Sequence, residues 1–256
     1  MRIVLKFGSG ILTKINRPEP DPVQLRKLIE AVALLKQGGH QCVVVSSGAV
    51  ASGLKPLGLD ARPTDMTTLQ ACAAVGQTQL MHAYESLLRD HNLSIAQLLL
   101  THGDLENEER GGRVKATLER LLEFPRVVPV INENDSVAVE ELRYGDNDKL
   151  SSRVARLWNA DVLLLLTSVP GLMEGDSKEP IPEVLDVETV LSHVRDEKGS
   201  LSVGGMASKL KAVQDAVSGG VECIIASGRH AEQIPALLRG EGVCTRFRVT
   251  TATETH

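Results

Sequence analysis

Six short apolar runs, each closed by small polar residues, limit the folds open to this chain of 256 residues. The runs are too short for helices and rich in β-branched residues, so they predict buried strands. They lie at residues 3–10, 43–50, 98–104, 127–135, 163–171 and 223–229. Helical patterns separate them, an alternation typical of a parallel sheet covered on both faces. The sequence therefore predicts an α/β fold, a three-layer αβα sandwich around a mostly parallel sheet.

The helical pattern after the first strand is the clearest one. Asp21 is placed to cap it, Pro22 suits its first turn, and Gly38 follows its apolar stripe. A longer pattern runs from about residue 65 to 91. Asp148 is expected to be the N-cap of one of the later helices. These later helices are expected at residues 113–124, 149–158, 207–218 and 231–238.

The chain reads as a single domain. Its composition does not change along its length, and it shows no internal repeat. The Gly- and Pro-rich segment 170–182 fits either a linker or a loop that covers a ligand, and we favour the loop. We expect one domain over residues 1–249 and a frayed tail over 250–256.

Charge and aromatic content exclude one class of partner. The formal net charge is −5 and aromatic residues make up 2% of the chain, so neither phosphate-backbone binding nor base stacking is expected. No nucleic-acid partner is predicted. The sequence has no signal peptide and no stretch of membrane-spanning length, which predicts a cytoplasmic protein without a membrane partner. The four scattered cysteines are expected to be reduced and mostly buried.

The ends of the apolar runs carry the candidate site. The carboxyl ends of parallel strands meet at one sheet edge, where α/β proteins bind ligands. Two acidic-amide clusters, Asn132 to Asp135 and Asp146 to Asp148, follow one strand closely enough to meet there. Taken alone, the first cluster is also explained by Asx-turns and Asp148 by helix capping. Their convergence on one edge favours a polar binding site.

Two glycine-containing segments are suited to phosphate. Lys6 precedes Gly8 and Ser9 after the first strand, and Gly204 and Gly205 precede Lys209 at the start of a late helix. Backbone N–H groups, a helix N-terminus and lysine charges all attract phosphoryl oxygens. Either lysine taken alone is more often a solvated residue. The chain has neither a P-loop motif nor a GxGxxG fingerprint, so P-loop enzymes and Rossmann dehydrogenases are excluded.

A set of motifs in order along nearly the whole chain resembles the amino-acid kinase family, in its glutamate 5-kinase branch. They are LKFGSG (5–10), VVVSSGAVASG (43–53), AAVGQ (73–77), INENDSV (131–137), GDNDKLSS (145–152) and GGMASK (204–209). The resemblance implies the amino-acid kinase fold. It also implies transfer of the γ-phosphoryl group of ATP, with Mg²⁺, to the side-chain carboxylate of L-glutamate, the first step of proline biosynthesis.

The resemblance also assigns roles. Lys6 and Lys209 match phosphate-binding lysines, and Asp148 matches the acidic residue that orients them. The glutamate-binding positions it implies are Ser47, Gly48, Ala49, Asp135 and Asn147. The nucleotide-binding positions it implies are Lys6, Gly8, Ser9, Thr167, Ser168, Val203, Gly204, Gly205, Met206, Ala207, Ser208 and Lys209. Magnesium is expected mainly on the nucleotide phosphates, and its protein ligands are not assigned.

The chain departs from the family pattern on the nucleotide side. Ser168 stands where an aspartate is usual, Met173 where a tyrosine is usual, and residues 201–206 read LSVGGM in place of a Gly-Thr-Gly-Gly-Met pattern. These departures bear on nucleotide preference. Residues 242–247 resemble the close of the kinase domain, so we expect a short form without the C-terminal PUA domain that many members carry.

Two alternative functions stay open from the sequence. One is a related kinase with another small acceptor, and the other is a non-catalytic sensor that binds nucleotide or an amino acid. The family further suggests a homo-oligomer, either a dimer or a tetramer, and feedback inhibition by proline.

Overall fold

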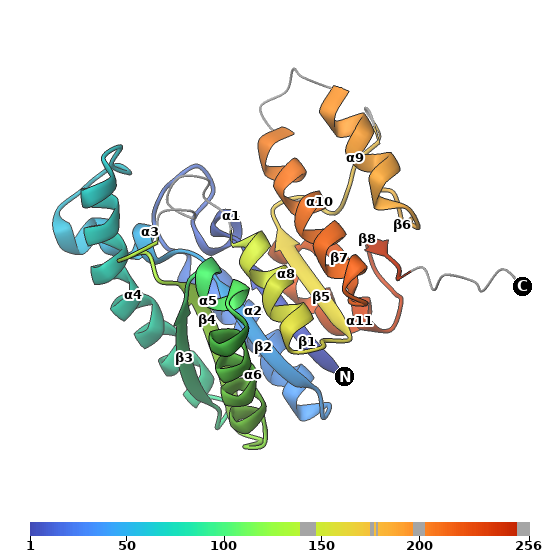
Figure 1. Ribbon diagram of the computed structural model, residues 1–256. Helices are drawn as coiled ribbons and strands as arrows, with labels where there is room; N and C mark the ends of the chain where they lie inside the picture. The colour runs from blue at the N-terminus through green and yellow to red at the C-terminus, as the bar shows by residue number, and fades with distance from the viewer. Residues whose placement is uncertain (139–146, 175–176, 178, 197–202, 250–256) are drawn as a thin grey trace, which may run out of the picture.

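The computed structural model describes residues 1–138, 147–174, 177, 179–196 and 203–249. Within these ranges one sheet runs in the order β3-β4-β2-β1-β5-β7-β8-β6 (Figure 1). The strands are β1 (Arg2–Phe7), β2 (Gln41–Ser46), β3 (Ser94–Leu100), β4 (Val127–Glu133), β5 (Val162–Thr167), β6 (Glu183–Val184), β7 (Glu222–Ser227) and β8 (Cys244–Phe247).

The six predicted strands are all present and all parallel. Every neighbouring pair from β3 to β7 is parallel, and only β8 runs antiparallel to β7. Their carboxyl ends therefore lie along one edge of the sheet, as the sequence predicted. The short strands β6 and β8 were not predicted, and they close the sheet beyond β7.

Helices cover both faces of the sheet (Figure 1). The α-helices are α1 (Ser9–Leu12), α2 (Pro22–Gln37), α3 (Ala49–Leu54), α4 (Met66–Arg89), α5 (His102–Glu106), α6 (Glu108–Leu122), α8 (Asp148–Leu157), α9 (Val187–Asp196), α10 (Val203–Ser218) and α11 (Ile234–Leu238). Two 3₁₀ segments, η1 (Lys55–Leu57) and η2 (Gly228–Gln233), complete the described elements.

Two apolar cores separate the three layers. Leu5 and Leu164 face the core beneath α2, α4 and α11, whereas Val4 and Leu163 face the core beneath α6, α8 and α10. Successive strand residues thus point to opposite faces, and both faces are buried. The expected αβα sandwich is confirmed.

Local signals placed some helix ends well and others poorly. The start of α2 is as predicted, with the Asp21 side chain accepting from the Gln24 backbone N–H. The expected helix at 113–124 begins earlier, at Glu108, because Asn107 caps it. The prediction of Asp148 as an N-cap is wrong. Asn147 holds that position, Asp148 begins the helix, and its carboxylate pairs with two lysines, Lys6 and Lys209.

Helices α3 and α4 approach each other so closely that only glycine fits between them. A Cβ on Gly76 would lie 1.8 Å from the carbonyl oxygen of Ala49, and one on Gly53 would lie 1.9 Å from that of Cys72. Because α3 directly follows the carboxyl end of β2, this contact fixes the chain that leaves that strand.

The structure bears on two further predictions, which concern the cysteines and membrane-spanning helices. Cys42, Cys72, Cys223 and Cys244 are all free and buried, as predicted. Among the described residues, no helix combines the length and apolar character needed to cross a bilayer. The tail at 250–256 lies outside the described residues, as do Asp146, Leu201 and Ser202.

Candidate active site

Four neighbouring strands bring the predicted site residues together. In the sheet, β4, β2, β1 and β5 are consecutive, and each is followed by a segment that the sequence had singled out. Lys6 is near the end of β1, Ser47 follows β2 and Asp135 follows β4. The N-terminus of α8 supplies Asn147 and Asp148 to the same edge.

Asp148 holds the two predicted phosphate lysines at once. Its Oδ1 lies 2.5 Å from the Nζ atom of Lys6, and its Oδ2 lies 2.9 Å from the Nζ atom of Lys209. Lys6 and Asp148 are 2% and 0% exposed, whereas Lys209 is 14% exposed. Two ammonium groups from β1 and α10 therefore sit side by side, with one carboxylate between them.

Burying this triad of charged groups costs free energy. An isolated charge taken out of water costs several kcal/mol, so Lys6 can be buried only because a carboxylate meets it. Asp148 also gains from its place in the first turn of α8, where the helix dipole favours negative charge. With two lysines and one aspartate, the triad keeps a net positive charge, which suits an anionic ligand.

The segment from residue 8 to 10, which we call the phosphate loop, lies beside this triad. A Cβ on Gly8 would be 3.4 Å from the Nζ atom of Lys6, and a Cβ on Gly10 would be 4.0 Å from Oγ of Ser168. The loop thus runs between β1 and the end of β5. Ser9 is exposed and begins α1.

A buried amide network joins the ends of β2 and β4. The Asn147 side-chain amide donates to the backbone oxygen of Ser46 at 2.6 Å and to Oδ1 of Asn132 at 2.7 Å. Asn132 in turn donates to Oε1 of Gln77 at 2.8 Å. The network therefore links α8, β4 and α4, and it holds Asn147 in one orientation.

Some buried polar atoms next to this network have no hydrogen-bond partner among the described residues. They are Oγ of Ser47, Oδ1 of Asp135, Oδ1 of Asn147 and Nε2 of Gln77. Buried polar groups are nearly always paired, because leaving one unpaired costs about 1–3 kcal/mol. Their concentration at one edge of the sheet marks a place where a polar ligand would complete the bonding.

Asp135 also has an altered acidity. Burial disfavours its charged form and raises the pKa of the Asp135 carboxyl to about 6, against a smaller opposing effect from the Arg62 charge. A cationic ligand group beside Asp135 would restore the charged form.

A pocket of about 230 Å³ opens at the end of β4. Its lining includes Ala49 and Asp135, together with Gln77, Glu133 and Asn134. Drug-sized ligands occupy sites of roughly 300–1,000 Å³, so this pocket suits a smaller molecule. Of the other predicted glutamate residues, Gly48 lines a separate pocket beside α2 and α4. Gly48 also has a φ of +100°, which glycine adopts without strain.

The predicted nucleotide residues lie on the other side of Lys6. Thr167 ends β5, and Ser168 follows it in an exposed position. Val203 and Gly204 begin α10, and the helix continues through the rest of the predicted segment. The exposed Gly205 and the half-buried Met206, Ala207 and Ser208 precede Lys209. These segments border the triad at β5 and α10.

Comparison with known proteins identifies the family. The model of the amino acid kinase family matches residues 1–227. The chain belongs to the amino acid kinase family. The glutamate 5-kinases of Myxococcus xanthus and Methylococcus capsulatus are each 42% identical to it. The alignments cover 97% and 95% of this chain and 67% and 66% of the relatives, so the chain spans about two thirds of their length.

A solved structure with the same arrangement is the carbamate kinase from Giardia lamblia bound to AMP-PNP. It superposes with a TM-score of 0.68 over 96% of this chain and 98% of that chain, at 14% sequence identity. This likeness confirms that the chain has the fold of the amino acid kinase family.

Sequence reasoning missed several residues of the site in this family member. Gln77 was noticed only within a motif, and Asn132 only as a member of the acidic-amide cluster, although together they fix Asn147. Ser46 was read only as part of a strand end, whereas its hydroxyl is hydrogen-bonded to the Tyr84 hydroxyl at 2.9 Å. The signal available for Ser46 and Asn132 was their place at the end of a buried apolar run, whereas Gln77 lies within α4 and carried no such signal.

Within the described ranges, no group of three or more His, Cys, Asp or Glu side chains is arranged to hold a metal ion. The acidic residues nearest the phosphate loop have other tasks, since Asp148 is engaged by Lys6 and Lys209. A magnesium ion at this edge would therefore fit best on phosphate oxygens.

Proposed function

We propose that this chain transfers the γ-phosphoryl group of ATP to the side-chain carboxylate of L-glutamate and forms L-glutamyl 5-phosphate. The observation that carries the proposal is the Asp148 carboxylate with Lys6 on one oxygen and Lys209 on the other. In the sheet order, β1 with Lys6 lies between β4, which the acidic-amide cluster follows, and β5, which ends at Thr167.

The nucleophile in this reaction needs no base. A glutamate side chain has an unperturbed pKa of about 4.3, so it is ionised at neutral pH. The obstacle is repulsion between that carboxylate and the phosphates. Catalysis must come from alignment and from neutralising charge on the transferred phosphoryl oxygens. Lys6 and Lys209 supply that charge, and Asp148 keeps their ammonium groups in place.

Glutamate would be held by the buried polar atoms that need a partner. Asp135 is suited to the substrate ammonium, and the Ser47 hydroxyl to a substrate carboxylate. The amide hydrogens of Asn147 already bond Ser46 and Asn132, so its remaining acceptor, Oδ1, is suited to the ammonium. Backbone N–H groups at Gly48 and Ala49 add donors where β2 passes into α3. The amide network through Asn132 holds Asn147 in position before the substrate arrives.

ATP would lie across the phosphate loop and the start of α10. Gly8, Ser9 and residues 203–208 offer backbone N–H groups to its phosphates, and Thr167 and Ser168 border its nucleoside. Magnesium, when bound with the nucleotide, neutralises phosphate charge and aligns the γ-phosphoryl group.

The proposal extends to the setting of the enzyme. The reaction would be the first step of proline biosynthesis, in the cytoplasm. Proline carries an ammonium and a carboxylate, the groups that Asp135 and Ser47 would bind, so it is a candidate inhibitor. The proposal also includes a homo-oligomer, either a dimer or a tetramer. Its support is that β3 is the edge strand of the described sheet and carries Leu99, an apolar side chain that is 39% exposed and suits contact with a second subunit.

A coupled assay of ADP release tests the activity. Purified protein with ATP and Mg²⁺ should release ADP only when L-glutamate is added, and D-glutamate and L-aspartate should be much poorer acceptors. Folded protein that shows no L-glutamate-dependent turnover would refute the proposal. Strong turnover with another acceptor in the panel would instead indicate a related kinase.

The non-catalytic alternative is disfavoured by the triad. A protein that only senses nucleotide or amino acid has no need to bury a lysine against an aspartate at the phosphate loop. Binding of ATP and glutamate without any product in the same assay would revive it.

A further inference from the structure

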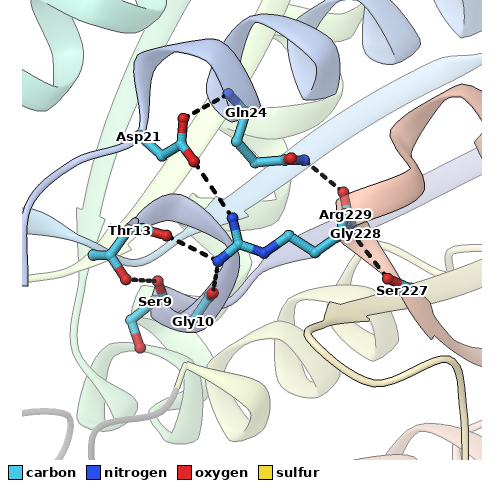
Figure 2. A network of polar contacts seen from close by, with 8 residues as sticks. All are labelled: Ser9, Gly10, Thr13, Asp21, Gln24, Ser227, Gly228 and Arg229. Carbon is cyan, nitrogen blue, oxygen red and sulfur yellow. Dashed lines mark hydrogen bonds and ion pairs between the residues drawn. The ribbon is translucent and has the colours of Figure 1, made fainter. Parts of the chain in front are cut away.

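Arg229 lies just past the carboxyl end of β7, in η2, and reaches the far end of the phosphate loop (Figure 2). Its guanidinium Nη2 donates to the carbonyl oxygen of Gly10 at 2.6 Å and to that of Thr13 at 2.9 Å. Its Nη1 lies 3.5 Å from Oδ2 of Asp21. One side chain thus connects β7, the helix α1 and the start of α2.

The contacts close into a circuit. Asp21 uses its other oxygen, Oδ1, to accept from the Gln24 backbone N–H at 3.0 Å. The Gln24 side-chain amide then donates to the carbonyl oxygen of Gly228 at 2.6 Å, next to Arg229 itself (Figure 2). Gln24 is buried and Arg229 is 20% exposed, so solvent screens the circuit only in part.

The phosphate loop needs such outside support. Its residues Ser9 and Gly10 form the first half of α1, which has four residues and no side-chain cap at its N-terminus. Helices this short are not stable by themselves, and glycines at 8 and 10 leave the backbone free to move. A positive charge at the last carbonyl groups of a helix is favourable, and a guanidinium fork can serve several acceptors at once.

Packing holds the same two segments together. A Cβ on Gly228 would lie 2.4 Å from Cδ1 of Ile11, so the chain just before Arg229 sits directly against α1. Ile11 is itself completely buried. The position of the loop is therefore set from β7 by both an apolar contact and the guanidinium.

We propose that Arg229 is a positioning residue for phosphoryl transfer, which holds residues 8–10 where their backbone meets the nucleotide phosphates. Arg229 touches none of the reacting atoms in this assignment. The inference rests on the proposed function, because it takes the phosphate loop as the place where ATP binds.

The test compares Arg229→Met and Arg229→Lys with the wild type. Arg239→Met is the matched control, since Arg239 is an exposed arginine nearby in sequence that contacts Pro235 and Glu241 and not the loop. Three measurements are made for each protein: affinity for AMP-PNP with Mg²⁺ by calorimetry, kcat and KM for each substrate, and the melting temperature.

Arg229→Met should lower both AMP-PNP affinity and kcat by about 10- to 100-fold, because a displacement near 1 Å is enough for such a loss. The KM for glutamate should stay within about twofold, since the partners of Arg229 are Gly10, Thr13 and Asp21, none of which is assigned to glutamate. Arg229→Lys should lie between the two, because an ammonium keeps the charge but not the fork. The control should match the wild type.

Several results would overturn the inference. One is AMP-PNP affinity in Arg229→Met equal to the control, and another is an equal loss for both substrates in step with a lower melting temperature. If Arg229→Met does not fold, wild-type AMP-PNP affinity in Arg229→Lys overturns it instead. Absence of glutamate turnover in the wild type refutes the proposed function alone, because the calorimetry still decides the role of Arg229.

Discussion

At the carboxyl ends of β2 and β4, Asn147 is fully buried and bonded to Ser46 and Asn132. At the end of β5, Ser168 is exposed, and within the described residues neither its side chain nor that of Thr167 makes a hydrogen bond. We call the first region the acceptor side and the second the nucleotide side. On the acceptor side, hydrogen bonds within the protein hold the polar side chains in place. On the nucleotide side, the polar side chains at the end of β5 are not held in this way, and the backbone mainly defines the surface.

This difference matches the different demands of the two ligands. A small amino acid offers few atoms, so its recognition depends on polar groups held in advance. A nucleotide brings several phosphate oxygens, which backbone N–H groups and lysines bind without a specific side-chain network. The contrast also agrees with the sequence, whose departures from the family pattern all fall on the nucleotide side.

The triad between the two sides should show the largest effect. Asp148→Ala leaves Lys6 buried without its carboxylate, so the free energy of unfolding should fall by about 3–5 kcal/mol and activity should be lost. Urea denaturation measures the first and the ADP assay the second. The exposed pair of Glu85 and Arg89 is the control, and Glu85→Ala should cost less than about 1 kcal/mol. A small cost for Asp148→Ala would mean that Lys6 is not held as described.

Lys209→Ala should lower turnover far more than it affects glutamate binding. Its ammonium is more accessible than that of Lys6, and its charge is needed most as the phosphoryl group transfers. We expect kcat to fall by about 100- to 1,000-fold, with the KM for glutamate nearly unchanged. Lys211→Ala is the control on the same helix, where Lys211 is exposed. A rise in the KM for glutamate without loss of kcat would contradict this role.

Asp135→Asn should act on the acceptor side alone. Loss of the charge that meets the substrate ammonium should raise the KM for glutamate by about 10- to 100-fold, with a smaller change in kcat. Asp90→Asn, at an exposed carboxylate on the far end of α4, is the control. In the wild type, the KM for glutamate should rise as the pH falls below about 6, where Asp135 becomes protonated. A flat profile would contradict the assignment.

The same residue should reveal a cost in stability. The pKa of Asp135 is raised in the folded protein to about 6, above its ordinary value of 3.8, so the folded state holds the proton more tightly. Its contribution to stability is present at low pH and is lost as the pH rises through about 6. Asp135→Asn should therefore be more stable than the wild type at pH 8, on the order of 1–3 kcal/mol. A difference in the free energy of unfolding between Asp135→Asn and the wild type that is equal at pH 5 and pH 8 would contradict this.

Ser168→Asp should give the smallest effect. It restores the carboxylate usual in the family at an exposed position, where a new charge contributes little. We expect a change of about threefold or less in the KM for ATP, and none in the KM for glutamate. A large change in the KM for glutamate would show that the two sides are not independent.

The sequence predicted the parts of the fold that depend on short-range patterns. Six strands, the parallel sheet and the limits of α2 follow from apolar runs and local capping by Asp21. Helices α1 and α3 were not predicted, because each is only a few residues long and is held by packing on distant segments. The early start of α6 was missed because Asn107 was not recognised as its cap.

The sequence predicted which residues form the site but not which contacts join them. Lys6, Lys209 and Asp148 were chosen from motifs, yet the sharing of one carboxylate between two lysines depends on α8 and α10 packing side by side. The role of Gln77 depends on α4 crossing the end of β4. Arg229 gave no signal at all, because its partners at Gly10 and Thr13 are backbone atoms more than two hundred positions away.

The contact of Gly76 with Ala49 restricts how this protein can change over evolution. Any side chain at Gly76 would collide with the backbone of α3, and α3 carries Ala49 at the mouth of the pocket. Mutations that alter substrate specificity must therefore occur at residues around the contact between α3 and α4, and not at the contact itself. One hydrogen atom in place of a methyl group at Gly76 thus allows α4 to pack on α3 and holds Ala49 at the pocket.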